Sequence, residues 1–314
     1  MTAKSYSGEQ LAQYAARISL TSPLESAQNP VARLTELVHH QLVHVPFETL
    51  ALHYSPDRLI SLDTAALFDK IVTRRRGGYC LENNTFFGHV LRSLGYSVYG
   101  VVCRITMATR GVHDGSWRSM SHMANVVTLN NIKYLVDVGY GADGPITPLA
   151  LIPSHGVVQI GLPGQQLRLE QRTLPQHEDA GQKVWVYSQR RGGRRDETWQ
   201  DVYHFPETEF LAADFDVLNF YNMSQSLWAK TVVVQRFERG GDGQIDKTLL
   251  LLRQVVQEGD GKGKEQHVIA SLQGEDERIA AFDRLFGIML SEQERQAIAG
   301  RPSEITERGA EVKD

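Results

Sequence analysis

The apolar residues of this 314-residue chain change their spacing twice, and this limits the folds that the chain can adopt. Up to about residue 95 they recur every three or four positions, which is typical of amphipathic helices. From Ser97 they alternate or run in short segments bounded by turn residues, which predicts a sheet or a small barrel. From about Asp214 two glycine-rich hairpins follow, and then two helices. The sequence therefore predicts an α+β fold of several domains, ending in a disordered tail over 302–314.

Capping residues predict where some of these helices begin and end. Asn29 followed by Pro30 is typical of a helix start, because the asparagine side chain accepts bonds from free N–H groups and proline fits the first turn. Gly95 suits the left-handed position just after a helix. A shorter helix is expected over 62–72, and Ser291 with a glutamate three residues later forms a capping box.

Composition excludes several classes of partner. The net charge of −4 gives no electrostatic reason to bind nucleic acid or an anionic membrane. No apolar run approaches the ~20 residues that span a bilayer, and the first residues lack the apolar core of a signal peptide. We therefore expect a cytoplasmic protein without a nucleic-acid or membrane partner. Two cysteines, Cys80 and Cys103, are too few for a disulfide framework or a zinc cluster, so no metal site is predicted.

Cys80 is the first candidate for chemistry. It follows the flexible pair Gly77-Gly78 and stands at the start of the helical pattern that ends at Gly95. The free N–H groups of a first helical turn favour a thiolate over a thiol. The alternative is that Cys80 is a small buried apolar residue, which is the usual fate of a free cysteine.

A hairpin brings a base and a carboxylate together. Asn130-Asn131 suits a two-residue turn, since asparagine tolerates positive φ. The pairing that this turn sets places His122 and Asp137 diagonally on one face, roughly 7–8 Å apart at the backbone. A turn one residue longer would put them on opposite faces. Each alone is more often structural, but with Cys80 they match a nucleophile, a base and the group that orients the base.

Other motifs are set aside. Residues 139–144 read GxGxxG after a strand, but the prolines that follow argue against the helix that a dinucleotide site needs. The arginine clusters at 74–76 and 190–195 are interpreted as solvated loops without an aromatic platform. His39, His40 and His44 lack the spacing of a metal site.

Four ordered motifs stand out, and they are Pro46-Phe47-Glu48-Thr49-Leu50, Arg76-Gly77-Gly78-Tyr79-Cys80-Leu81-Glu82-Asn83-Asn84, Ser121-His122-Met123-Ala124-Asn125-Val126 and Val136-Asp137-Val138-Gly139-Tyr140-Gly141. They resemble the motifs of the arylamine N-acetyltransferase family, and a fungal member is one interpretation. The resemblance implies a helical bundle over 1–96 that carries the cysteine, a β-barrel over 97–213 that carries His and Asp, and an α/β lid over 214–314. The first two would share a papain-like core.

The resemblance also implies an activity. Cys80 would take an acyl group from acetyl-CoA or another acyl-CoA, and a small aromatic amine or hydrazine would then take it from the thioester. Acyl-CoA would be a co-substrate, with no permanently bound cofactor. Acetyl, propionyl and malonyl donors all stay open, and Arg104, Arg110 and Arg118 are candidates to pair a second carboxylate. A thiol hydrolase or amide synthase with the same triad, and a catalytically silent interaction protein, are the alternatives; the oligomeric state is left open.

Further positions are carried over from the family motifs. The acceptor pocket would be lined by Phe47 and Tyr140, for which ordinary core packing is the alternative. Structural support of the cysteine loop would come from Arg76, Gly77, Gly78 and Glu82. Coenzyme A would contact Arg118, Ser119, Tyr221, Ser224 and Ser226.

Overall fold

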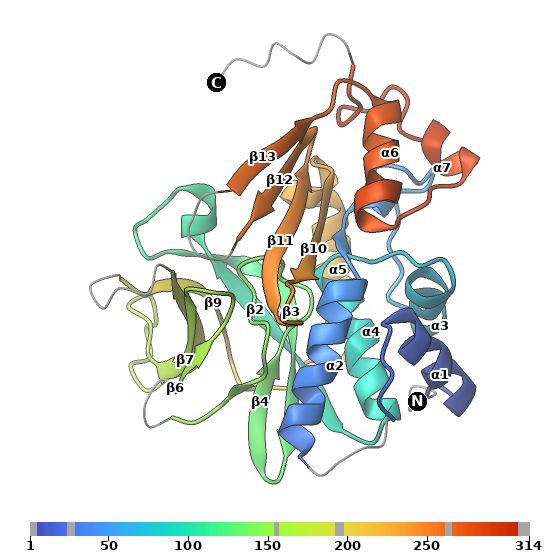
Figure 1. The fold of residues 1–314 in the computed structure, drawn as a ribbon. Coiled ribbons are helices and arrows are strands. Elements are labelled where there is room, and N and C mark those ends of the chain that lie inside the picture. Colours follow the sequence, from blue (N-terminus) through green and yellow to red (C-terminus); the bar gives the residue numbers. More distant parts are fainter. Residues whose placement is uncertain (1–4, 24–28, 154–156, 192–197, 261–265, 307–314) are drawn as a thin grey trace.

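The computed structural model of the chain describes residues 5–23, 29–153, 157–191, 198–260 and 266–306. Figure 1 shows α1 to α4 gathered on one side of the molecule and strands β6, β7 and β9 on the other, with a second sheet and α6 above them. The α-helices are α1 (Gly8–Arg17), α2 (Pro30–His44), α3 (Thr64–Phe68), α4 (Cys80–Ser93), α5 (Ala212–Gln225), α6 (Glu275–Phe286) and α7 (Glu292–Gln296). Shorter turns are η1 (Leu50–Leu52), η2 (Asp69–Thr73), η3 (Met107–Arg110) and η4 (Leu227–Ala229).

The predicted helix ends are confirmed where capping chemistry marks them. The Asn29 side chain accepts bonds from the first N–H groups of α2, and Ser291 forms the expected capping box at the start of α7. Gly95 follows α4 with φ 87°. The helix expected over 62–72 is α3, which continues into the π-type turn η2. None of the helices described is long and apolar enough to cross a bilayer.

The strands expected after Ser97 belong to an eight-stranded sheet with the order β5-β4-β3-β2-β9-β8-β7-β6. Its end strand β5 also contacts β6 and β7, so the sheet curls into a nearly closed, barrel-like form. Large aromatic side chains fill its interior, among them Trp185, Tyr187 and Tyr203. The strands are β2 (Ser97–Thr106), β3 (Trp117–Leu129), β4 (Ile132–Val136), β5 (Leu149–Ala150), β6 (Val157–Ile160), β7 (Gln165–Arg172), β8 (Val184–Arg191) and β9 (Gln200–Phe205).

A five-stranded antiparallel sheet with the order β1-β10-β11-β12-β13 forms the C-terminal part. Both predicted hairpins are confirmed, and α6 packs on this sheet through Phe282 and Phe286. Its edge strand β1 comes from the N-terminal region and precedes Cys80 by about thirty positions in the chain. The strands are β1 (Phe47–Glu48), β10 (Val233–Arg239), β11 (Ile245–Leu252), β12 (Val255–Gly259) and β13 (Gln266–Ser271).

The hairpin register predicted for β3 and β4 is confirmed. Leu129 pairs with Ile132, and the ladder runs on to Asn125 opposite Val136. Asn130 and Asn131 both have positive φ, 49° and 62°, as a tight two-residue turn requires. Asp137 follows directly after the ladder, on the extension of β4.

Some expectations need correction. The last residues are not a tail from Pro302 onward, because the carbonyl of Ser303 accepts a bond from Arg278 and the N–H of Ile305 donates to Glu275; residues 307–314 lie outside the described part. Arg190 and Arg191 belong to β8 rather than to a loop, and residues 192–195 lie outside the described part of the chain.

One member of that second arginine cluster, Arg190, also has an aromatic neighbour, which it shares with Arg168. The guanidinium groups of Arg168 and Arg190 lie over the ring of Trp199, at 4.4 and 4.9 Å from its centroid. The GxGxxG segment is followed by turns and not by a helix, as expected. Within the described residues no group of three or more His, Cys, Asp or Glu side chains is placed to hold a metal ion.

Candidate active site

Cys80 is the first residue of α4, as its sequence context predicts. The preceding residue, Tyr79, is the N-cap, and its N–H donates to the carboxylate of Glu82 at 3.0 Å. Cys80 is 4% exposed, and its Sγ lies 3.9 Å from the carbonyl oxygen of Ser121 on β3. The first turn of α4, whose N–H groups have no acceptor within the helix, therefore begins at a buried sulfur.

His122 and Asp137 form a buried pair. The distance from Nε2 of His122 to Oδ2 of Asp137 is 2.7 Å. Burial opposes the charged imidazolium, but the neighbouring carboxylate and a hydrogen bond with Cys80 outweigh it and raise the pKa of His122 to about 10. Burial likewise opposes ionisation of Asp137, yet His122 lowers the pKa of that carboxyl. The three predicted side chains are thus brought together, with the imidazole between the thiol and the carboxylate.

Asn84 links the helix of the cysteine to the carboxylate. Its Nδ2 donates to Oδ1 of Asp137 at 2.9 Å and to the carbonyl of Met123 at 2.7 Å, and its Oδ1 accepts the N–H of Val138 at 3.0 Å. The N–H of Gly139 gives Asp137 another bond at 2.9 Å. Because Asn84 is one helical turn after Cys80, it lies on the same face of α4.

Gly77 and Gly78 are required by close packing. A Cβ atom on Gly77 would stand 1.9 Å from the carbonyl oxygen of Pro46, and one on Gly78 would stand 2.5 Å from Cβ of Glu82. The segment is also paired to β1, through a bridge between Phe47 and Gly78. Larger residues would push the loop that carries Cys80 out of place.

A buried network of charges supports this loop. Arg76 is 2% exposed and bonds to Glu48 at 2.9 Å and to Glu294 at 2.9 Å. Lys70 contacts Glu82 at 2.6 Å and Glu48 at 3.5 Å. Burial raises the pKa of Glu82, whereas for Glu48 the two cations overcome burial and lower the pKa. The structural positions predicted for Arg76 and Glu82 therefore lie in one charge network beside the cysteine loop.

Helix α5 forms hydrogen bonds both to the segment that carries Cys80 and to β3. Asn219 accepts a hydrogen bond from the hydroxyl of Tyr79, and Asn222 donates to the carbonyl of Ser121 at 2.9 Å. The two asparagines are three residues apart and share the buried face of the helix. The sequence did not single them out, since each resembles an ordinary polar helix residue until the helix is placed against the site.

Phe47 and Tyr140 both lie at the site. Phe47 shares an apolar cluster with Cys80 and packs against Trp228, with 5.3 Å between ring centroids. Tyr140 stands edge-on to the imidazole of His122 at 5.0 Å. Tyr203, which the sequence did not indicate, packs against both rings, with its ring centroid 5.3 Å from that of His122 and 5.2 Å from that of Tyr140. It comes from β9, and no local pattern marks it.

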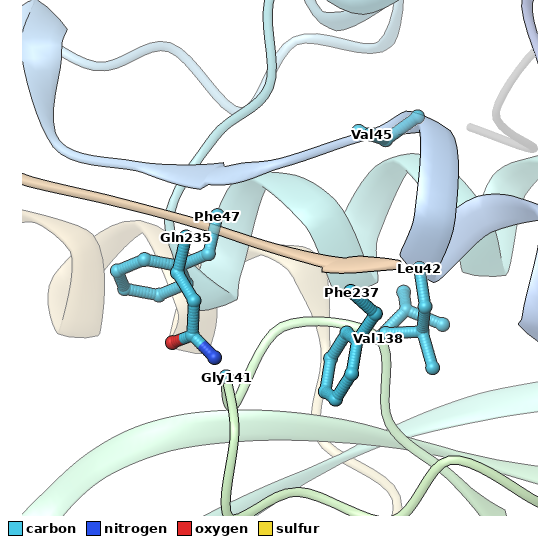
Figure 2. Close-up of a pocket in the computed structure, with 7 residues that line it drawn as sticks. All are labelled: Leu42, Val45, Phe47, Val138, Gly141, Gln235 and Phe237. Atoms are coloured by element: carbon cyan, nitrogen blue, oxygen red, sulfur yellow. The ribbon is translucent and has the colours of Figure 1, made fainter. Parts of the chain in front are cut away.

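A small hollow lies beside Phe47, between α2, β10 and the segment after Asp137. Figure 2 shows the amide of Gln235 directed toward Gly141 at its edge. The volume is about 10 Å³, which has room for about one water molecule. Nε2 of Gln235 is buried there without a hydrogen-bond partner among the described residues. This hollow suits a bound water and is too small for an aromatic amine.

The positions expected to contact coenzyme A differ in exposure. Ser119 and Tyr221 are exposed, and Arg118 is half-buried. Ser224 is exposed, with its hydroxyl donating to a carbonyl of its own helix at 2.9 Å. Ser226 is buried, and its hydroxyl donates to the carbonyl of residue 222 at 2.6 Å and caps η4. Their contact with coenzyme A stays a prediction.

Comparison with known proteins places this arrangement in a family. The N-acetyltransferase family profile matches residues 30–295. The N-malonyltransferase FDB2 of Gibberella moniliformis is 32% identical over 285 residues, covering 86% of this chain and 81% of that protein. The arylamine N-acetyltransferase of Nocardia farcinica is 29% identical, with a TM-score of 0.75 and coverage of 95% and 96%.

A second solved structure agrees in fold. The arylamine N-acetyltransferase of Mycobacterium marinum, solved in complex with CoA, superposes with a TM-score of 0.74 at 24% identity, covering 94% of this chain and 99% of that one. The family profile runs from the start of α2 into α7 and includes the segments that carry Cys80, His122 and Asp137. The chain belongs to the arylamine N-acetyltransferase family and is an acyltransferase.

Proposed function

We propose that the protein is an acyl-CoA-dependent N-acyltransferase that works by a ping-pong mechanism through a thioester on Cys80. The supporting observation is a buried thiol at a helix start beside a histidine that bonds to a buried carboxylate at 2.7 Å. An imidazolium held by Asp137 stabilises a thiolate next to it, which is the reactive form of cysteine. His122 acts as the base and Asp137 fixes its tautomer and orientation.

The two half-reactions balance around these residues. Proton transfer from the Cys80 thiol to His122 leaves a thiolate, which attacks the thioester carbonyl of acyl-CoA. The C–S bond to coenzyme A breaks, and the departing sulfur takes the proton from the imidazolium. In the second half an amine attacks the enzyme thioester, its proton passes to His122, and the Cys80 sulfur leaves. Backbone N–H groups of the first turn of α4 stabilise the oxyanion in both halves.

The substrates proposed are those that the relatives' names suggest. FDB2 is named an N-malonyltransferase and the bacterial relatives arylamine N-acetyltransferases, so malonyl-CoA and acetyl-CoA are the donors to test. Small aromatic amines are the proposed acceptors, with Phe47 and Tyr140 beside the thioester. In this proposal 1–96 and 97–213 form a papain-like core, 214–314 form a lid, and the protein is cytoplasmic.

Intact-mass spectrometry with each acyl-CoA, with and without a 4-substituted aniline, tests this function. We expect an acyl adduct that the aniline discharges and water does not. Cys80→Ala should lose the adduct, whereas Cys103→Ala, which removes the other thiol from the barrel interior, should keep it. His122→Ala should fail to load. Rapid discharge by water would instead indicate a hydrolase, and no adduct with any donor would indicate a silent interaction protein.

A further inference from the structure

A single carbonyl oxygen is shared between the sulfur of Cys80 and helix α5. The ladder pairs His122 with one residue of β2 and Met120 with the next, so Ser121 is an extra residue in a bulge of β3. The carbonyl oxygen of Ser121 lies 3.9 Å from Sγ of Cys80 and accepts a bond from Nδ2 of Asn222 at 2.9 Å. The thiol and the amide therefore have one acceptor in common.

The amide of Asn222 has a fixed orientation. Asn222 is 1% exposed and Ser121 is 4% exposed, and only the NH2 end of an amide can donate to a carbonyl. Its Oδ1 is left buried without a hydrogen-bond partner among the described residues, which is unfavourable. An apolar side chain of the same size would pack there without that cost. The bond donated to Ser121, rather than packing, accounts for an amide at this position.

The carbonyl of Ser121 and the imidazole of His122 compete for the proton of the thiol. Nε2 of His122 bonds to Asp137 at 2.7 Å, so Nδ1 is the ring nitrogen left for the sulfur. A thiol is a weak donor, and its contact with the carbonyl is long at 3.9 Å. A carbonyl that already accepts the short bond from Asn222 attracts a second donor less strongly. The imidazole is then the stronger acceptor.

We propose that Asn222 is a positioning residue that occupies the Ser121 carbonyl, so that the proton of Cys80 passes to His122 and is not retained by the carbonyl. This inference rests on the thioester chemistry proposed above. In the step the S–H bond of Cys80 breaks and an N–H bond forms at Nδ1 of His122, while Asn222 and Ser121 exchange no proton. Helix α5, from the C-terminal region, thereby takes part in activating a cysteine that lies far earlier in the chain.

The other titratable groups around Cys80 and His122 are common to wild type and to the variants below. Asp137 bonds to the imidazole, Arg118 lies on β3 and Glu82 lies on α4. Burial raises the pKa values of four further groups well above their usual range: Tyr79, Cys103, Tyr140 and Tyr203. The buried face of α5 consists of Phe215, Leu218, Asn219 and Asn222, none of which titrates. The effects of these groups cancel when two proteins are compared at one pH.

Single-turnover loading of Cys80, followed by quenched intact-mass spectrometry at several pH values, tests this role. The donor is acetyl-CoA or malonyl-CoA at saturation, whichever loads the full-length wild-type chain. Asn222→Leu keeps the size of the side chain but not the donor, and should slow loading about 3- to 10-fold at pH 7. The deficit should shrink at pH 9.5, because hydroxide then removes the proton that the carbonyl retains. The donor concentration that gives half the maximal rate should not change.

Leu218→Ala is the matched control on the same helix. Leu218 is 8% exposed and belongs to the apolar cluster of Cys80, so its truncation loosens α5 without removing a hydrogen-bond donor. Its rate relative to wild type should be the same at pH 7 and pH 9.5. Loading of Asn222→Leu at the wild-type rate overturns the proposal. So does a deficit that does not change with pH, or one that Leu218→Ala reproduces, since either would indicate packing alone.

Asn222→Asp decides the question if the leucine variant does not fold. A protonated carboxyl group can donate to the Ser121 carbonyl and an ionised one cannot, and burial favours the protonated form. Loading of this variant should therefore be close to wild type at pH 6 and clearly slower than wild type at pH 9.5. An equal ratio to wild type at both pH values overturns the proposal. Absence of any adduct on the wild-type protein would instead refute the thioester mechanism, which is a separate result.

Discussion

Replacing Asn84 by alanine should both destabilise the protein and slow its acylation. The side chain makes three buried hydrogen bonds, to Met123, Asp137 and Val138. A buried backbone group left without a partner costs about 1–3 kcal/mol, and a bond to a charged carboxylate contributes about 1.5–3 kcal/mol. The sum is roughly 4–9 kcal/mol, and entry of a water molecule would recover part of it. We expect a loss of about 3–5 kcal/mol in the free energy of unfolding.

The kinetic effect follows from the same contacts. Asp137 keeps its bonds to His122 and to the N–H of Gly139, but it loses the donor that ties it to α4. The pKa of Asp137 should rise and the imidazole should be held less firmly, so we expect acylation of Cys80 to slow about 10- to 100-fold, or ~1.4–2.8 kcal/mol in the barrier. Urea unfolding gives the stability, and single-turnover loading at 10 °C on the folded protein gives the rate.

A matched control separates chemistry from folding. Gln165 on β7 is also a buried amide, with its Oε1 accepting the N–H of Leu162 at 2.9 Å and its Nε2 donating to Gln189. Gln165→Ala should lose about 2–4 kcal/mol of stability and still load at close to the wild-type rate. If Asn84→Ala unfolds at the wild-type urea concentration, or loads no more slowly than Gln165→Ala, the role assigned to Asn84 is refuted.

Two further predictions concern charge. The pKa of His122 is raised from about 6.5 to about 10, so protonated His122 stabilises the folded protein fully below pH 6.5, and this stabilisation is lost as pH rises through 10. The difference in unfolding free energy between wild type and His122→Gln should therefore be smaller in urea titrations at pH 9.5 than at pH 6. A constant difference would contradict this. Arg76→Met leaves the buried Glu48 charge poorly compensated and should lower the free energy of unfolding, measured by chemical denaturation, by about 3–5 kcal/mol. The double variant that also carries Glu48→Leu should recover most of this loss. Equal stability of the single and double variants would argue against the charge network.

Features encoded by neighbouring residues were predictable. The helix that starts at Cys80 is marked by its apolar spacing and by Gly95 after its end, and the register that joins His122 to Asp137 depends on the asparagine turn between their strands. These are local rules of capping and turn geometry, so no knowledge of the rest of the chain is needed. The essential geometry of the candidate triad could therefore be anticipated.

Features set by distant contacts were not predictable. Tyr203 reaches His122 only because β9 pairs with both β8 and β2, and Asn222 meets Ser121 from about a hundred residues away. The polar composition after Pro302 favoured disorder, yet Arg278 and Glu275 hold the backbone there. The carboxylate partner of Arg76 at Glu294 is similarly remote, and no local pattern encodes any of these pairings.

The pairing of β1 with β10 has a consequence for how the enzyme is made. Thr49 bonds to the carbonyl of Thr231 across 182 positions, and the neighbouring Phe47 bridges to the cysteine loop at Gly78. A chain emerging from the ribosome carries Cys80, the proposed nucleophile, long before the strand that completes the support of its loop has been synthesised. We infer that the setting of Cys80 is completed only when the C-terminal sheet forms, so the candidate site matures among the last features of the molecule.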